Sequence, residues 1–314
     1  MATWQVVLSF TAIAAMRVVQ KLCSKRVSGA VGGNVFFHYG GYYNLLSALL
    51  SVIALAISGF SGFTWPTVLC AAGTALFLAL ELFASLKALQ STSLIVCQMF
   101  SVGSLCIPCI VGIFLFDEPM SIWQWLGVLL FMISMYFIIR PAPSADAAEK
   151  SAPTQKLSLK TLLLLVLLLV AGGGTMVMQK AFGVLVPDGN VSTYSFLMFA
   201  LNSAFMYVTY VILLTTQHRS HGDTAVAEKQ GARPLPRLLL VSGAFLAVAV
   251  FVINLLVTMM GKDVSSAVLF SVSNAISIVI TLLVGALYYK ERVTVFNVIG
   301  ILLCVGAIAI INFL

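Results

Sequence analysis

Apolar residues occur along the chain in ten long runs, separated by connections that are mostly short and polar. A helix that spans a bilayer needs about 20 consecutive apolar residues. The pattern therefore predicts an all-α polytopic membrane protein with ten transmembrane helices. The runs cover roughly residues 3–23, 34–58, 65–88, 91–116, 121–139, 161–185, 193–215, 237–260, 264–289 and 294–313.

Two connections are long and break the rhythm of the apolar runs. Residues 141–160 are rich in Ala, Pro, Ser and Lys, and residues 217–236 are polar. The first of them divides the chain into two five-helix units, residues 1–140 and residues 161–314. Because five is an odd number, two units with the same fold must be inserted in opposite orientations. The sequence thus predicts two inverted five-helix repeats.

A spaced motif recurs near the end of each predicted unit and supports the repeat. It consists of a glycine, a glutamate after five intervening residues, and a second glycine after eight more. We interpret each glutamate as a charge that favours a helix N-terminus, and each second glycine as a point of close helix approach. The residues are Gly112, Glu118 and Gly127, which recur 173 positions later as Gly285, Glu291 and Gly300.

The two segments that carry this motif are GIFLFDEPMSIWQWLGVLL and GALYYKERVTVFNVIGILL. Each resembles the end of an EamA repeat, the unit of the drug/metabolite transporter superfamily. The resemblance extends over nearly the whole chain, as two five-helix units. It implies a secondary transporter or exporter of a small polar metabolite that works by alternating access without ATP. It also implies a central cavity lined by the third, fourth, eighth and ninth helices.

Composition agrees with a membrane protein, since 61% of the residues are hydrophobic and 9% are charged. The net charge of +7 comes from basic residues placed in connections and at helix ends, so we expect no nucleic-acid partner. Fifteen basic residues fall on the side that follows odd-numbered helices, including Arg17 and Lys21, and only Lys180 and Lys262 fall on the other. This bias predicts a multi-pass plasma-membrane protein with both termini outside, whereas many members of the resembled family keep their termini in the cytoplasm.

Glu81 is the most informative single residue, because it lies deep inside a predicted membrane helix. An ionisable group at that depth is a candidate functional residue. The offset of 173 pairs it with Asn254, so we expect the two to approach each other near the midplane and to bind substrate. Glu81 is a candidate for pairing with a cationic substrate or for carrying a coupling proton. The alternative is a protonated glutamate hydrogen-bonded between helices, or one that reaches toward Lys87.

The same offset relates two weakly polar helix faces, which we expect to face the interior of the bundle. Gln98, Ser101, Ser271 and Asn274 are the substrate-binding candidates among them, and Pro108 is a predicted kink. The alternative for the serines is ordinary hydrogen bonding between packed helices. The faces consist of Gln98, Ser101, Ser104 and Pro108, and of Ser271, Asn274, Ser277 and Thr281.

A slightly different offset relates the early helices of each unit. Asn44 and Asn202 are 158 positions apart, and Gln20-Lys21 and Gln179-Lys180 are 159 apart. Asn44, Asn202 and Tyr39 complete the substrate-binding candidates, with an interfacial aromatic belt as the alternative for Tyr39. We also expect close helix packing at residues 172–174, which are three consecutive glycines.

These observations favour a transporter over two rivals, a membrane-embedded enzyme and a structural or sensory membrane protein. The chain has only three histidines, His38, His218 and His221, and two of them lie in a polar connection. We therefore expect no catalytic residues, no metal and no cofactor. The expected partners are a small-molecule substrate, the lipid bilayer and protons as a candidate coupling ion, for a chain that is a monomer or a homodimer.

Overall fold

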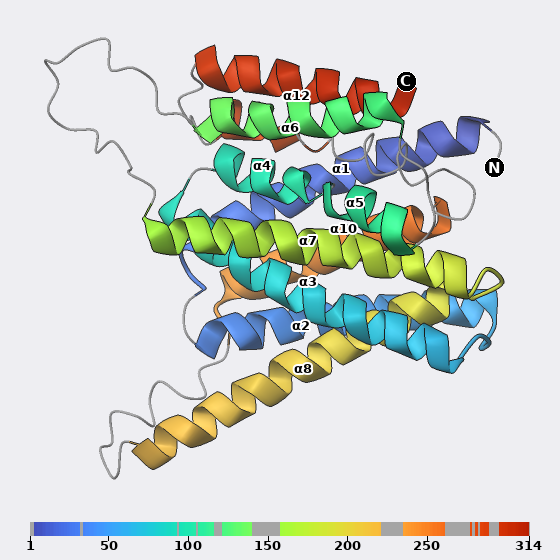
Figure 1. The fold of residues 1–314 in the computed structure, drawn as a ribbon. Coiled ribbons are helices and arrows are strands. Elements are labelled where there is room, and N and C mark those ends of the chain that lie inside the picture. The colour runs from blue at the N-terminus through green and yellow to red at the C-terminus, as the bar shows by residue number, and fades with distance from the viewer. Residues whose placement is uncertain are drawn as a thin grey trace, which may run out of the picture.

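The computed structural model describes residues 3–31, 34–92, 94–104, 106–115, 121–139, 158–220, 235–260, 277, 280–281, 283–288 and 295–313. Within these ranges the regular elements are all helices, drawn in Figure 1. They are α1 (Thr3–Ser28), α2 (Asn34–Ser58), α3 (Trp65–Ser91), α4 (Leu94–Gly103), α5 (Cys106–Leu115), α6 (Ile122–Ile139), α7 (Leu159–Leu185), α8 (Val191–Ser220), α10 (Arg237–Met260), the π-helical turn η1 (Val284–Tyr288) and α12 (Val295–Phe313).

Six of these helices contain stretches that are long and apolar enough to cross a membrane, which confirms the membrane class. Shorter apolar stretches lie in α6 and α12. Most of the predicted span 264–289 falls outside the described residues, so the count of ten stays a prediction. The six stretches are Val7–Ser28, Asn34–Ser58, Trp65–Ser91, Leu159–Leu185, Val191–Thr216 and Arg237–Met260.

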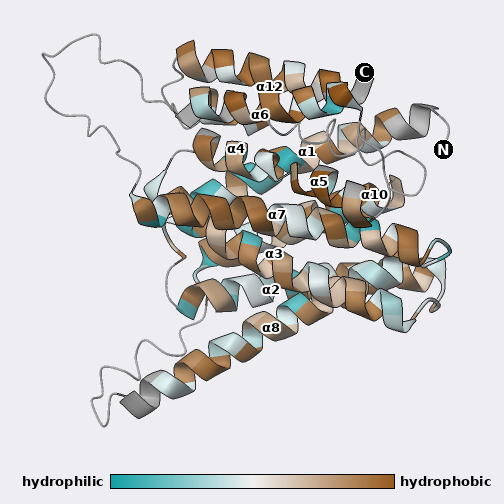
Figure 2. Ribbon diagram, in the orientation of Figure 1, coloured by the Kyte–Doolittle hydropathy of each residue, from teal (hydrophilic) through white to brown (hydrophobic). Residues whose placement is uncertain are grey.

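The helices bury polar faces and expose apolar ones, which is the reverse of a soluble protein. On α2, Asn44 and Ser47 are completely buried, whereas Leu45, Leu49 and Ile53 are 44–60% exposed. Figure 2 shows apolar residues along the outward sides of the helices. Lipid solvates such apolar faces, and polar groups must find partners inside the bundle. The exposed surface is therefore apolar enough to contact lipid, and polar side chains are buried in the interior of the bundle.

Within the predicted helix 91–116 the structure describes α4 and α5 with a turn at Ser104 between them, and residue 105 lies outside the described residues. Pro108 has no N–H to donate to the carbonyl of Ser104, four residues earlier. That carbonyl instead accepts the N–H of Ile107 at 3.1 Å, and the Ser104 hydroxyl donates to the Ser101 carbonyl at 2.6 Å. The proline predicted to kink the helix thus accompanies an interruption at Ser104, which is buried.

Helices of the first half pack mainly on helices of the second half. α2 packs on α8, α3 on α7, α1 on α10 and α6 on α12. Gly127 and Gly300 are buried in α6 and α12, which lie side by side in Figure 1, while Glu118 and Glu291 lie outside the described residues. The largest core cluster likewise joins α2 and α3 to α8 and α10. The core is therefore shared between the halves.

The three glycines of α7 bring this helix very close to its neighbours, as predicted. A Cβ atom on Gly172 would lie 3.0 Å from the Ser104 hydroxyl, and one on Gly173 would lie 2.5 Å from the Ile107 Cβ. A Cβ on Gly174 would lie 2.5 Å from the ring of Phe77 in α3. The glycines allow α3, α7 and the α4–α5 interruption to meet at one level of the bundle.

Candidate functional site

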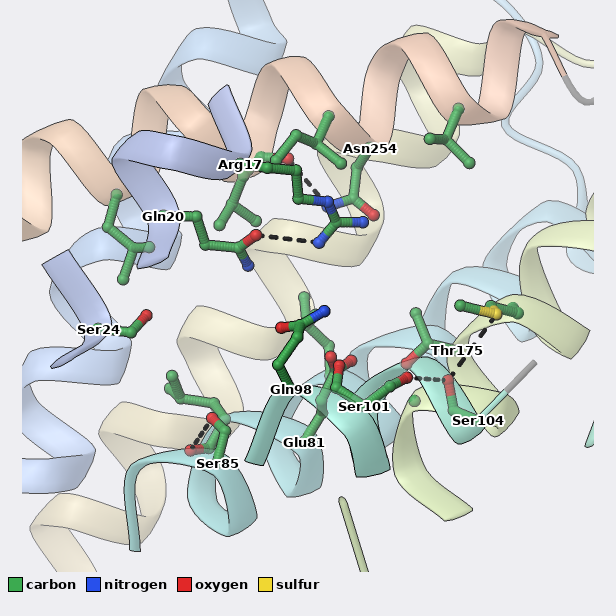
Figure 3. A pocket seen from close by; sticks show the side chains of 18 of the residues that line it. Arg17, Gln20, Ser24, Glu81, Ser85, Gln98, Ser101, Ser104, Thr175 and Asn254 are labelled. Atoms are coloured by element: carbon green, nitrogen blue, oxygen red, sulfur yellow. Dashed lines mark hydrogen bonds between the residues drawn. The ribbon is translucent and has the colours of Figure 1, made fainter. Parts of the chain in front are cut away.

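A polar cavity lies in the bundle between α1, α3, α4, α7 and α10, with one residue from α2. The cavity has a volume of about 120 Å³ and is partly open to solvent. Apolar side chains of α10 line one wall, and polar groups occupy much of the rest. Figure 3 shows ten of these polar side chains around the cavity. The polar lining consists of Arg17, Gln20, Ser24, Tyr43, Glu81, Ser85, Gln98, Ser101, Ser104, Thr175, Gln179 and Asn254.

Arg17 brings a cation into the cavity from the middle of α1. Its Nη1 donates a hydrogen bond to Gln20 Oε1 at 2.9 Å, one turn further along the same helix. Its Nε is buried and has no hydrogen-bond partner among the described residues. Arg17 also interacts electrostatically with Glu81 and with Lys21. A guanidinium held in this way retains donor capacity for a further group.

Glu81 faces the same cavity from α3. The side chain is half-buried, and its carboxyl carbon would lie 3.9 Å from a Cβ atom on Gly172. The cations that interact with it are Arg17 and Lys21, both on α1. Glu81, which was expected deep in a membrane helix, therefore lines a cavity inside the bundle. The cations that interact with it belong to the protein itself.

Two amide side chains of the second half form a pair on another wall. Gln179 on α7 donates from Nε2 to Asn254 Oδ1 on α10 at 2.8 Å. The amide nitrogen of Asn254 donates in turn to the carbonyl of Val250 at 2.9 Å. The two amides are thus hydrogen-bonded to each other, and that of Asn254 is also bonded to the backbone, while both side chains line the cavity.

Gln98 reaches the cavity from α4, next to the helix interruption. Its Nε2 donates to Ser277 Oγ at 2.8 Å, whereas its Oε1 is buried without a hydrogen-bond partner in the described ranges. Figure 3 shows Gln98, Ser101 and Glu81 together on one side of the space, facing Arg17, Gln20 and Asn254. An unpaired buried carbonyl costs free energy, so Gln98 is suited to accept a hydrogen bond from a bound molecule or water.

The structure brings together four of the predicted substrate-binding residues: Glu81, Asn254, Gln98 and Ser101 all line the cavity. Ser271 and Asn274 lie outside the described residues. For these two residues, and for the four that line the cavity, contact with a substrate stays a prediction.

The other three candidates are away from the cavity lining. Asn44 and Asn202 are completely buried and meet each other, with Asn202 Nδ2 donating to Asn44 Oδ1 at 3.3 Å between α2 and α8. Tyr39 is also completely buried and belongs to the core cluster of α2, α3, α8 and α10. These side chains lie in the packing between the halves, where Asn202 Oδ1 is buried without a hydrogen-bond partner among the described residues.

Sequence reasoning missed the contribution of α1 to the cavity. Arg17 and Lys21 lie within the predicted span 3–23 but were counted with the basic residues of the side that follows the first helix, and α1 continues beyond them to Ser28. The cue was present in the repeated Gln-Lys pair, since Gln20 and Gln179 both line the cavity. The pair was used only to measure an offset, and its place within the bundle was overlooked.

The offsets predicted from the sequence pair two charged cavity residues with two neutral ones. The 159-residue offset matches Arg17 with Met176, and the 173-residue offset matches Glu81 with Asn254. All four residues line the cavity. The first half of the chain therefore supplies a cation and a carboxylate to the cavity, and the residues paired with them by these offsets supply a thioether and an amide.

Comparison with known proteins gives one family and one fold. Residues 159–313 match the model of the family described as EamA-like transporter family. No curated protein matches the chain. Twenty-eight chains of solved structures match it. One of them, a crystal structure of a protein, aligns over 97% of this chain and 95% of its own length, with a TM-score of 0.61 and 14% sequence identity. That identity establishes similarity of fold alone.

Proposed function

We propose that this chain, whose residues 159–313 match the EamA-like transporter family, moves a small polar metabolite across a membrane by alternating access. Proteins of this family are transporters rather than enzymes. The plasma membrane is the proposed location, and efflux or exchange is the proposed mode.

The observation that carries the proposal is the polar cavity shared by the two halves. Arg17 and Glu81 enter it from the first half, and Gln179 and Asn254 enter it from the second. Ionisable groups inside a membrane helix are unfavourable unless they serve a function or find partners. A site at the interface of two halves that move relative to each other is where secondary transporters bind substrate. The interruption between α4 and α5, beside the cavity at Ser104, is a further feature of such sites.

Helix pairing supports the proposed inverted repeat. If the halves are exchanged, α2 takes the place of α8 and α6 that of α12, so the pairs α2–α8 and α6–α12 map onto themselves. The pair α1–α10 then maps onto α3–α7, which also pack together. In Figure 1, α1 and α7 run in opposite directions, as do α2 and α8. This is the pattern expected of two inverted units related by a two-fold axis.

In a protein built from two inverted units, each unit can adopt the conformation of the other, and this exchange would open the cavity to the opposite side of the membrane. Gln179 now bonds to Asn254, whereas its counterpart Gln20 accepts a bond from Arg17. In the opposite-facing state, Gln20 bonds to Glu81 and Gln179 separates from Asn254. Glu81 remains the candidate for proton coupling, because a change of its hydrogen-bond partner changes the relative free energies of its two protonation states.

Solute flux into vesicles that contain the purified full-length protein tests the proposal. The panel consists of amino acids, nucleobases, sugars and organic acids, each compared with protein-free vesicles. At least one class is expected to cross faster with the protein, and Ser101→Phe, which fills the cavity, is expected to remove that flux. If no solute crosses faster while the protein remains folded, transport is the wrong function.

A further inference from the structure

We infer that the cavity receives a small organic anion, whose carboxylate or phosphate group binds the guanidinium of Arg17. This inference rests on the proposed transport function and specifies its substrate class. It contradicts the earlier hypothesis that Glu81 selects a cationic substrate.

The first support is the donor capacity of Arg17. The guanidinium has five N–H donors and no acceptor, and it matches carboxylate and phosphate oxygens geometrically. One nitrogen, Nη1, is used by Gln20, and Nε has no hydrogen-bond partner within the described part of the chain. Gln20 is neutral, so it orients the guanidinium without neutralising it. An anionic group would supply both the missing acceptors and a counter-charge.

The second support is the balance of charge around the cavity. Ten Asp and Glu residues occur in the chain, and Glu81 is the only one inside a predicted membrane span. Two cations, Arg17 and Lys21, interact electrostatically with it. These three groups sum to one net positive charge when Glu81 is ionised and to two when it is protonated, in an environment of low dielectric constant where an uncompensated charge is costly. A bound anion reduces this excess in both cases, whereas a cation would increase it.

The third support is the chemistry opposite Arg17. Gln98 Oε1 is buried with no hydrogen-bond partner among the described residues, and Figure 3 shows Gln98 facing the same space as Arg17. A carbonyl oxygen accepts an O–H or N–H but repels an anionic oxygen. The solute therefore has an anionic end toward Arg17 and a hydrogen-bond donor toward Gln98.

The asymmetry of the two halves limits the site to one anion. Met176 occupies the position that corresponds to Arg17, and its thioether contacts the Ser104 hydroxyl with an O–S distance of 4.0 Å. A thioether carries no charge and binds no anion. The cavity thus has a cationic wall on α1 and a neutral wall on α7.

Binding and flux measured on the same purified full-length protein test the inference. The probes are four small solutes of similar size: glycerate as a carboxylate, glycerol 3-phosphate as a phosphate, glycerol as a neutral solute and ethanolamine as a cation. Binding is read from the rise in thermal unfolding temperature, because a ligand of the native state stabilises it. At least one anion is expected to bind and to cross, with glycerol and ethanolamine inactive in both measurements.

Three variants separate the role of Arg17 from a general effect of charge. Arg17→Gln is expected to weaken anion binding about tenfold or more, since it removes a charge-assisted hydrogen bond. Arg17→Lys keeps the charge and is expected to retain part of the binding even if Arg17→Gln folds poorly. Lys180→Gln is the matched control, because it removes a basic residue at a helical position outside the cavity lining, and it is expected to leave binding unchanged.

The outcomes distinguish this inference from the proposed function. Anion binding that depends on Arg17 without any flux supports the inference and refutes transport. Flux of glycerol or ethanolamine that is unchanged in Arg17→Gln supports transport and overturns the inference. Absence of stabilisation by either organic anion, or stabilisation equal in wild type and Arg17→Gln, also overturns it.

Discussion

Gln179 donates a hydrogen bond to Asn254 at 2.8 Å across the cavity wall, and this bond joins α7 to α10 within the second half. The corresponding residues of the first half are Gln20 and Glu81, and there Gln20 bonds to Arg17 instead. The two halves thus differ at the positions where a two-fold relation would make them alike. This difference is the basis of the mechanism that we propose.

Gln179 and Asn254 are expected to be coupled in their contributions to the free energy of unfolding, because their side chains share a hydrogen bond. A double-mutant cycle of Gln179→Leu and Asn254→Leu is predicted to give a coupling free energy of about 0.5–1.5 kcal/mol, as found for hydrogen bonds within membranes. Reversible unfolding in mixed detergent micelles measures it. The control cycle combines Asn254→Leu with Gly183→Ala, where a new Cβ meets nothing within 4 Å. A coupling energy no larger than that of the control cycle would refute the prediction.

Glu81→Gln is expected to remove proton coupling while the protein still inserts and folds. The amide keeps the shape of the side chain, but it replaces one acceptor oxygen with a donor NH2 group and does not exchange a proton in the physiological range. Flux measured with and without an imposed proton gradient is predicted to become equal, and Glu81→Asp is predicted to retain part of the difference. Gradient-dependent flux in Glu81→Gln vesicles, equal to that of the wild type, would exclude Glu81 as the coupling residue.

Gly173→Ala is expected to destabilise the bundle at the α4–α5 interruption. The added Cβ would lie 2.5 Å from the Cβ of Ile107 and 2.9 Å from the carbonyl oxygen of Ser104, so the backbone must shift. Overpacking of this kind costs about 1–3 kcal/mol, which a thermal melt of the detergent-purified protein detects. Gly183→Ala lies on the same helix with no atom within 4 Å, and its melting temperature is predicted to equal or exceed that of the wild type. Equal losses in both variants would show that the close contact at Gly173 is not the cause, since Ala has the higher helix propensity at both positions.

The C-terminus is predicted to lie outside the cell. Placing Arg17 and Lys21 inside α1 leaves thirteen of the fifteen basic residues on the side predicted to be cytoplasmic, so the bias persists. A reporter that is active only in the cytoplasm, fused after Leu314, is therefore expected to be silent. An equivalent fusion within the connection 141–157 is expected to be active, and the reverse pattern would invert the proposed orientation.

Sequence periodicity was sufficient to predict most of the helices, because each apolar run is as long as a bilayer is thick. The bounds 34–58 and 237–260 agree with α2 and α10 to the residue. The division of the span 91–116 depended on one missing N–H at Pro108, which hydropathy does not register. The sequence indicated a kink there, but not that two separate helices result.

Only part of the cavity lining could be predicted from the sequence. Glu81, Gln98 and Asn254 were identifiable because they are polar residues in apolar runs. Arg17 was not, because it lies near the end of an apolar run, where basic residues usually mark a connection. α1 extends to Ser28, which places Arg17 in the middle of the helix, and the packing of α1 against α10 joins segments far apart in the sequence.

The pairing of each helix with a partner from the opposite half has a consequence for biosynthesis. Thr74 on α3 shares a 2.6 Å hydrogen bond with the hydroxyl of Tyr194 on α8, and Asn44 accepts one from Asn202. A ribosome delivers α2 and α3 to the membrane before α8 exists. These polar groups of the first half therefore lack their partners from α8, in lipid or at the insertion machinery, until the second half has been inserted. The newly inserted first half is an incomplete folding unit, and quality-control proteases have their longest access to the chain during that interval.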